Sequence, residues 1–240
     1  MKRSAIFTLI TLFVLIPLTL WFGMQLSGRW YYLTSTLIVV EIMIPFFFSF
    51  EERKPQAREL AVIAVMSAIA AVSRMVVPIP NFKPIFAVIM ISGIAFGPQT
   101  GFLVGAMSAF ASNFFASQGP WTPWQMMAYG VAGLLAGTLA RGRKMKKPLP
   151  LAVFGFVSVL LVIGPLLDLS SVFTMLTEIT WAGVLSVFGY GLTVNVSQGI
   201  STAVTLLLVS KPLLQMLERI RVKYGILDQR SFEAGKGDAQ

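Results

Sequence analysis

Long apolar stretches alternate with short polar or charged segments along most of the chain. A helix that spans a bilayer needs about 17–25 mainly apolar residues. On this criterion we expect eight membrane helices, at Ala5–Gly23, Tyr32–Phe50, Glu59–Val77, Pro84–Phe96, Gly101–Ala116, Trp124–Ala140, Leu151–Leu169 and Val184–Ser210. The fourth stretch reaches only about 20 Å as a helix, so it crosses only if neighbouring helices bury it or the bilayer thins. The pattern predicts an all-α polytopic membrane protein.

Charged residues divide this pattern into three parts. Glu51–Glu59 (EERKPQARE) is the only dense run of charge before residue 141. It separates a two-helix N-terminal hairpin, residues 1–50, from a six-helix membrane core, residues 51–212. Residues 213–240 are predicted to form a basic cytoplasmic tail, which begins with a surface helix at Leu213–Gly225.

The composition agrees with a membrane protein and excludes several other classes. Apolar residues make up 56% of the chain and charged residues 12%, and the mean hydropathy is +0.78. A soluble domain carries roughly 25% charged residues, so an ordinary globular enzyme, a disordered chain and a coiled coil are excluded. The chain has no Cys and no His, which removes thiolate chemistry and the commonest general base and metal ligand. We therefore expect no metal site and assign no catalytic residue, while the 10 acidic residues leave carboxylate chemistry open.

The net charge of +9 follows from an unequal distribution of Lys and Arg over the loops. With the N-terminus inside, all but three of the 19 basic residues lie on the cytoplasmic side, the exceptions being Arg29, Arg74 and Lys83. Cytoplasmic loops of membrane proteins concentrate Lys and Arg, so we predict that both chain ends are cytoplasmic. The basic residues are spread over four stretches, which favours contacts with lipid headgroups over a nucleic-acid site.

Small residues form a stripe along the third predicted helix. Ala57, Ala61, Ala64, Ala68 and Ala71 alternate between spacings of four and three residues, which places them on one helix face. Small residues let helices approach closely in lipid, where packing drives association. This face either packs inside the protein's own bundle or docks on another membrane subunit.

The segment Ala111–Met127 (ASNFFASQGPWTPWQMM) joins two predicted helices on the outer side. Pro120 and Pro123 make it stiff, and it carries no charge. Its amides, hydroxyl and indoles suit stacking and hydrogen bonding to a neutral, planar or amide-rich ligand. The candidate binding residues are Asn113, Gln118, Trp121, Thr122, Trp124 and Gln125. An aromatic belt at the membrane surface would account for the two Trp residues, but not for the amides and paired prolines.

Two further outer connections are predicted to face the same compartment. Asn81 and Lys83 lie in a short proline-rich loop, and Asp168 begins the last outer connection, which also holds Glu178. We expect Asn81 and Lys83 to close the ligand site from one side and Asp168 to close it from another.

Glu41 is the only carboxylate deep in an apolar stretch. An ionisable group in the hydrocarbon region is costly and is by default a functional candidate. The alternative is a structural role, either in a pair, with Arg74 as a candidate partner, or as a protonated group bonded to backbone. A membrane enzyme or assembly factor that uses Glu41, Asp168 or Glu178 as acid or base is an alternative function.

No energy source is visible in the sequence. The chain contains no phosphate-binding loop of the G-x-x-x-x-G-K-[ST] type and no relay of Asp and Glu through several helices. A small bundle with an outward-facing site then needs a partner to supply the work. A self-sufficient carrier is the remaining alternative.

Three segments resemble the substrate-binding S components of energy-coupling factor (ECF) transporters. They are Pro80–Pro84 (PNFKP), Gly93–Gly101 (GIAFGPQTG) and Ser112–Met126 (SNFFASQGPWTPWQM). The resemblance covers the six-helix block and implies a bundle that binds a vitamin or related nutrient under its outer loops. It also implies docking on a membrane coupling protein, which two ATP-hydrolysing subunits power. The alanine-rich first core helix of the family corresponds to Ala57, Ala61, Ala64 and Ala68.

Within the family, the segment GPWTPWQM is most similar to S components linked to uptake of cobalamin or its precursors. The resemblance implies the substrate-specific subunit of an ECF-type importer in a bacterial cytoplasmic membrane, with no intrinsic cofactor and with ATP used by the partner subunits. Two features depart from the family pattern. The N-terminal hairpin is extra to the six-helix core, and the lack of His means that amides and ring faces would have to hold a cobalamin.

Overall fold

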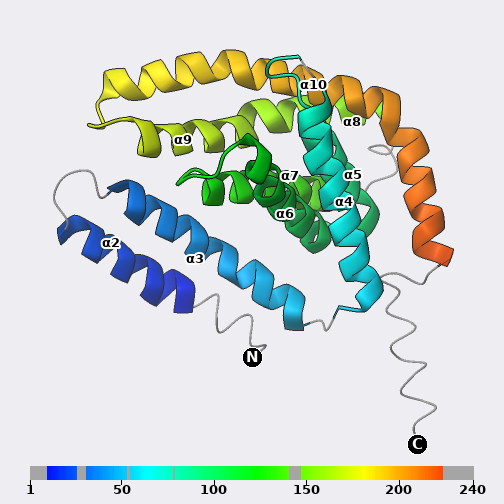
Figure 1. Cartoon of the computed structure of the whole chain (residues 1–240), viewed down its shortest axis with the longest axis horizontal. Coiled ribbons are helices and arrows are strands. Elements are labelled where there is room, and N and C mark those ends of the chain that lie inside the picture. The colour runs from blue at the N-terminus through cyan, green and yellow to red at the C-terminus, as the bar shows by residue number, and fades with distance from the viewer. Residues whose placement is uncertain (1–9, 26–30, 53–54, 78, 141–146, 224–240) are drawn as a thin grey trace, which may run out of the picture.

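The computed structural model describes residues 10–25, 31–52, 55–77, 79–140 and 147–223, which form a set of packed helices (Figure 1). The helical elements are η1 (Thr11–Leu15), α2 (Ile16–Gln25), α3 (Tyr31–Glu52), α4 (Ala57–Val76), α5 (Ile85–Phe96), α6 (Pro98–Ala116), α7 (Thr122–Leu139), α8 (Pro148–Ser158), η3 (Val159–Ile163), α9 (Gly164–Met175) and α10 (Trp181–Lys223). Over these ranges the chain contains no strand, which confirms the predicted all-α class.

Over the described residues, the elements group into eight helical rods, one for each predicted apolar stretch. The π-helical turn η1 leads into α2, and the π-helical turn η3 joins α8 to α9 in a single rod. Residues 5–9 of the first stretch lie outside the described part. Four described rods are long and apolar enough to cross a membrane, namely Tyr32–Glu52, Ala57–Val76, Pro148–Met175 and Trp181–Lys223. With the shorter apolar helices, they establish a polytopic membrane protein.

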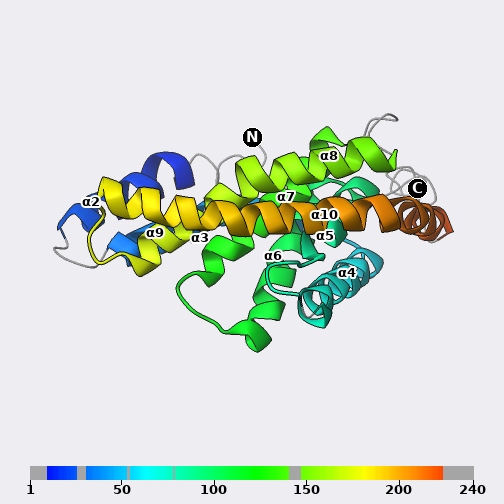
Figure 2. The ribbon, with the colours of Figure 1, turned by 90° about the horizontal axis from the view of Figure 1, so that it is seen from above.

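The short helix α5 lies at the centre of the bundle and contacts α4, α6, α7 and α10 (Figures 1 and 2). Every residue of α5 except Ala95 is buried. A helix that is apolar on all sides lies either inside a protein core or in a membrane, and α5 is too short to span a bilayer easily by itself. Neighbouring helices therefore bury the short fourth stretch, which is one of the two outcomes expected for it.

Glycine allows α5, α6 and α7 to meet backbone to backbone. A Cβ atom on Gly133 of α7 would collide with the carbonyl oxygen of Gly101 on α6, and a Cβ atom on Gly93 of α5 would collide with the carbonyl oxygen of Gly133. Close backbone approach gives helices in lipid the van der Waals contact that holds them together. The three helices α5, α6 and α7 therefore meet in direct backbone contact at Gly93, Gly101 and Gly133.

The N-terminal hairpin packs on the core through α3. Phe46 stacks on Phe102 of α6 with ring centroids 4.2 Å apart. The side-chain amide of Gln99, at the start of α6, donates a hydrogen bond to Ser49 Oγ at 2.8 Å. The hairpin is thus attached to the six-helix block by both apolar and polar contacts.

Glu41 faces the other helix of the hairpin. Its Oε1 accepts a hydrogen bond from Thr19 Oγ1 of α2, and its Oε2 is buried without a hydrogen-bond partner among the described residues. Arg74 instead donates to side chains of α6, so the pairing with Glu41 suggested by the sequence is wrong. The hydrogen bond of Glu41 joins α2 to α3.

Helix α10 has 43 residues and runs along the whole length of the molecule (Figure 2). It continues through the predicted boundary between core and tail at residue 212. Pro212 lies inside this helix and lacks the N–H that a helix interior uses, and Figure 1 shows α10 changing direction in its orange part. Beyond it, Leu217 is buried in the core, so residues 213–223 pack on the bundle. Tyr224 and Gly225 lie outside the described residues.

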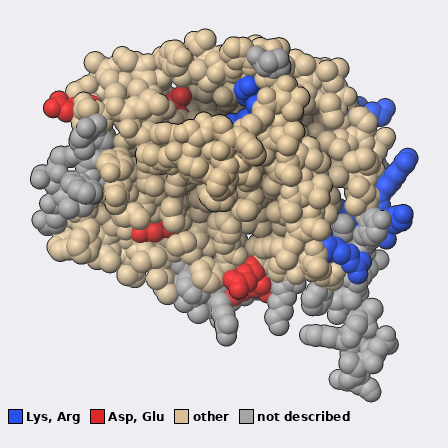
Figure 3. Space-filling model, viewed as in Figure 1, with Lys and Arg blue, Asp and Glu red and all other residues tan. Residues whose placement is uncertain are grey.

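Basic residues gather at one end of the face seen in Figure 3, where α4 begins and α10 ends. The described basic residues of these segments are Arg58, Lys211, Arg219, Arg221 and Lys223. This arrangement agrees with the unequal distribution of charge along the sequence.

Candidate functional site

A buried polar network joins α4, α6 and the start of α7. Asn113 of α6 is its centre and is only 1% exposed. Its Oδ1 accepts a hydrogen bond from Arg74 Nη1 at 2.8 Å, and its Nδ2 donates to Gln125 Oε1 at 2.8 Å and to Thr122 Oγ1 at 3.1 Å. The amide therefore uses both its acceptor and its donor inside the protein. We call Arg74, Ser112, Asn113, Gln118, Thr122 and Gln125 the Asn113 network.

The loop between α6 and α7 is held by the same network. Thr122 Oγ1 donates to Gln118 Oε1 at 2.9 Å and accepts from the Gly119 N–H at 3.2 Å. Ser117 at the start of the loop has φ 111°, a conformation that residues other than glycine rarely adopt. Thr36 Oγ1 of the hairpin, which donates to the Tyr32 carbonyl at 2.8 Å, lies 3.4 Å from the Pro120 carbonyl oxygen. These contacts attach the loop to the start of α7 and place it against the hairpin.

Arg74 supplies the positive charge of the network, and it was not among the predicted site residues. Its Nη1 also donates to Ser112 Oγ at 2.7 Å, and its guanidinium carbon lies 5.8 Å from the centroid of the Tyr129 ring. No carboxylate pairs with it among the described residues. The available sequence signal was its position inside the predicted membrane helix Glu59–Val77, because an intramembrane cation marks a functional candidate.

The two Trp residues of the loop segment differ in environment. Trp124 is 7% exposed and stacks on Phe173 of α9 with ring centroids 5.6 Å apart. Its indole N–H is buried and has no hydrogen-bond partner in the described ranges. Trp121 is half-buried beside Gly119. A surface belt requires exposed indoles, which describes Trp181 at 84% exposure but not Trp124.

The other three predicted site residues lie outside the Asn113 network. Asn81 is exposed and has φ 58°, and Lys83 Nζ donates to the Val77 carbonyl at 2.9 Å. Asp168 is buried and accepts from Asn195 of α10 at 2.7 Å. The prediction that Asp168 begins the outer connection is wrong, because α9 continues to Met175 and places Asp168 inside the helix.

The alanine stripe lies mostly on the uncovered side of α4. Ala57, Ala61, Ala64 and Ala68 are exposed, whereas Ala71 is buried. The opposite side of α4 packs on the core through Glu59, Ile63, Met66, Ser67 and Ala70. No helix in the described part of the chain covers the four exposed alanines, so they do not take part in the internal packing that the sequence left open. We call these four residues the alanine face.

The three carboxylates of the alternative enzyme do not share a site. Glu41 bonds to Thr19 within the hairpin, Asp168 bonds to Asn195 between α9 and α10, and Glu178 is exposed in the loop between these helices. No cluster of three or more acidic residues that could hold a metal ion occurs in the ranges that the structure describes.

Comparison with known proteins places the chain in a family. The family described as ECF-type riboflavin transporter, S component, matches residues 54–215, the part that runs from α4 into α10 and contains the Asn113 network. A UPF0397 protein of Vibrio atlanticus (strain LGP32) is 29% identical over 117 residues, which cover 45% of this chain and 64% of that protein. A UPF0397 protein of Aliivibrio fischeri (strain MJ11) is 31% identical over 87 residues, which cover 34% of this chain and 47% of that protein.

The chain therefore spans less than two thirds of the length of these curated relatives. No solved structure matches it. The family match nevertheless covers more than half of the chain and coincides with the six-helix block. The chain belongs to the family of ECF-type riboflavin transporter S components.

Proposed function

We propose that this chain is the substrate-specific membrane subunit of an ECF-type importer and that it binds a vitamin or related nutrient beneath its outer loops. The observation that carries the proposal is the family match over residues 54–215, because this segment contains every residue of the Asn113 network. The subunit carries out no reaction of its own in this proposal. It lies in a bacterial cytoplasmic membrane with both chain ends inside, as the distribution of Lys and Arg favours.

The side chains around the network favour a ligand with flat rings and several amide-type groups. The stacked pair of Trp124 and Phe173 offers an apolar wall, and the Trp124 indole N–H is a buried donor that lacks a partner among the described residues. Gln118 and Gln125 carry amides that can exchange hydrogen bonds within the network for bonds to a ligand. Cobalamin or one of its precursors is our first candidate because of the segment GPWTPWQM, and riboflavin, after which the matching family is named, is the second.

Energy would come from partner proteins. We propose that a membrane coupling protein docks on the alanine face and that two ATPase subunits drive release of the ligand to the cytoplasm. The exposed position of the four alanines supports this docking, since a small-residue face lets another helix approach closely. Reconstitution of the chain with and without these partners tests the scheme. Accumulation of the vitamin by the chain alone, without ATP, would show a self-sufficient carrier instead.

Replacing Gln125 by alanine should weaken ligand binding without unfolding the protein. The substitution removes the Oε1 that accepts from Asn113 Nδ2 and the amide that would bind the ligand. An unmade buried hydrogen bond costs about 1–3 kcal/mol, so the dissociation constant should rise roughly 5- to 150-fold. Titration of the purified protein with cobalamin, riboflavin and a queuosine precursor measures the effect and identifies the ligand.

The control for this titration is Gln56→Ala, which removes an exposed amide outside the network. We expect wild-type affinity for this variant. If Gln125→Ala binds the ligand as tightly as the wild type, the network is not the binding site. If the wild type binds none of the three compounds, our choice of substrate is wrong.

Replacing Ala64 or Ala68 by tryptophan should abolish transport but leave ligand binding intact. Both alanines are exposed on α4, and an indole there prevents the close helix approach on which docking depends. Co-purification with the coupling protein and vitamin uptake in vesicles measure the effect. Leu208→Trp, at an exposed position of α10, is the matched control and should assemble normally. Loss of ligand binding in Ala64→Trp would mean that this face supports the fold.

A further inference from the structure

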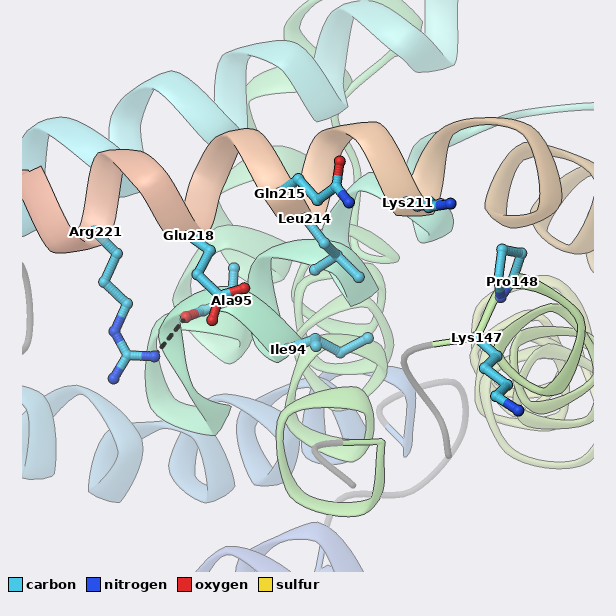
Figure 4. Close-up of a pocket in the computed structure, with 9 residues that line it drawn as sticks. All are labelled: Ile94, Ala95, Lys147, Pro148, Lys211, Leu214, Gln215, Glu218 and Arg221. Atoms are coloured by element: carbon cyan, nitrogen blue, oxygen red, sulfur yellow. Dashed lines mark hydrogen bonds between the residues drawn. The ribbon is translucent and has the colours of Figure 1, made fainter. Parts of the chain in front are cut away.

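We propose that a groove at the basic end of the molecule binds the phosphate group of an anionic phospholipid. The groove has a volume of about 400 Å³ and lies between the end of α5, the start of α8 and the last part of α10 (Figure 4). Three cationic side chains line it, those of Lys147, Lys211 and Arg221. This site is separate from the proposed vitamin site and goes beyond the proposed function.

Helical spacing on α10 builds one wall of the groove. Lys211, Leu214, Glu218 and Arg221 follow one another at intervals of three or four residues, so they project from one side of the helix (Figure 4). Leu217 is buried in the core and anchors this part of α10. The cations of the wall are therefore presented by a helix that is packed against the bundle.

The lining combines positive charge with an apolar surface. Lys147 and Lys211 are exposed, and Arg221 Nη1 donates to the Ala95 carbonyl at 3.4 Å. Glu218 is the one carboxylate of the lining, so three cations and one anion leave a net charge of +2. Ammonium and guanidinium groups bind phosphate oxygens by charge-assisted hydrogen bonds, whereas Ile94 and Leu214 suit the glycerol and acyl part of a lipid.

The position of the groove favours a lipid over a soluble anion or a protein. Lys and Arg gather at this end of the molecule (Figure 3), and basic pockets between membrane helices on the cytoplasmic side bind anionic headgroups. Figure 2 places α8, which forms one wall, on the opposite side of α10 from α4. The alanine face proposed for docking therefore lies elsewhere on the molecule.

The test measures binding of dioctanoyl phosphatidylglycerol to the full chain in an uncharged detergent by native mass spectrometry. Dioctanoyl phosphatidylcholine and inorganic phosphate are measured in parallel, and we expect both to bind at least tenfold more weakly. A Lys or Arg beside a membrane surface strengthens the binding of anionic lipids, and removal of one such charge weakens it about fivefold. We therefore expect this loss of phosphatidylglycerol binding in Lys147→Gln and in Lys211→Gln. Both lysines are exposed, so we expect these variants to fold normally.

Arg219→Gln is the matched control. It removes a positive charge from the same part of α10 but lies outside the groove lining, so it should keep wild-type affinity. An equal loss in this control would show diffuse attraction to the basic surface and overturn the proposal. Inorganic phosphate that binds as tightly as phosphatidylglycerol would overturn the lipid assignment. The proposal is also wrong if both lysine variants keep lipid binding but lose assembly with the coupling protein.

Discussion

Replacing Gly133 by alanine is expected to prevent stable folding of the membrane core. The added Cβ atom would collide with the carbonyl oxygen of Gly101 on α6. Backbone atoms cannot rotate away from such a contact as a flexible side chain can, so α6 and α7 must separate. Overpacking costs about 1–3 kcal/mol and sometimes more. We expect a loss of about 3 kcal/mol, because Gly93 of α5 meets Gly133 at the same place.

Thermal unfolding in detergent, followed by loss of monodispersity, measures this effect. Gly189→Ala on α10 is the matched control, because a Cβ atom at Gly189 meets no atom within 4 Å. Alanine is a better helix former than glycine by up to about 1 kcal/mol, so this control should be as stable as the wild type or slightly more stable. Equal stability of Gly133→Ala and Gly189→Ala would contradict the backbone contact between α6 and α7.

Replacing Asn113 by alanine should have the largest effect on the proposed ligand site. The change removes the acceptor of Arg74 and the donor to Thr122 and Gln125 in one step. Each buried group left unpaired costs about 1–3 kcal/mol, and a charged group costs more. Because several groups lose their partner together, we expect ligand affinity to fall at least about 100-fold and the free energy of unfolding to fall as well.

The same vitamin titration and thermal unfolding measure both effects. Gln56→Ala is again the control, since Gln56 is exposed and lies outside the Asn113 network. It should bind the ligand and unfold like the wild type. A variant Asn113→Ala with normal affinity would exclude the network from the ligand site.

The membrane class and the approximate places of the helices could be predicted because hydrophobicity acts locally. A helix that crosses a bilayer needs an apolar stretch long enough to span the hydrocarbon region, whichever helices surround it. The burial of α5 was also foreseeable, since the stretch Pro84–Phe96 is too short to cross easily alone. Helix ends were less predictable. The apolar pattern ends at Leu169, but α9 continues to Met175, so Asp168 lies inside the helix and not in the loop that follows it.

Four of the predicted binding residues come together in the structure, and the sequence provided their identity through the uncharged loop rich in amides. Their partners were not predictable in the same way. The sequence suggested Arg74 as the partner of Glu41, whereas Arg74 bonds to Ser112 and Asn113, and Glu41 bonds to Thr19. Periodicity shows which side chains share a face of one helix, but it does not show which helix that face meets.

The sequence by itself determined that this chain is helical and membrane-embedded and that it lacks the Cys and His side chains of a thiol or histidine site. These properties follow from the composition and from the lengths of the apolar stretches, which do not depend on how the helices pack. Only the tertiary structure decided that the alanine face is uncovered and that Arg74 joins the Asn113 network. It also decided that the basic end of α10 packs on the bundle and lines a groove together with α5 and α8. These features depend on contacts between helices far apart in the chain, and such contacts follow from the packing of whole faces.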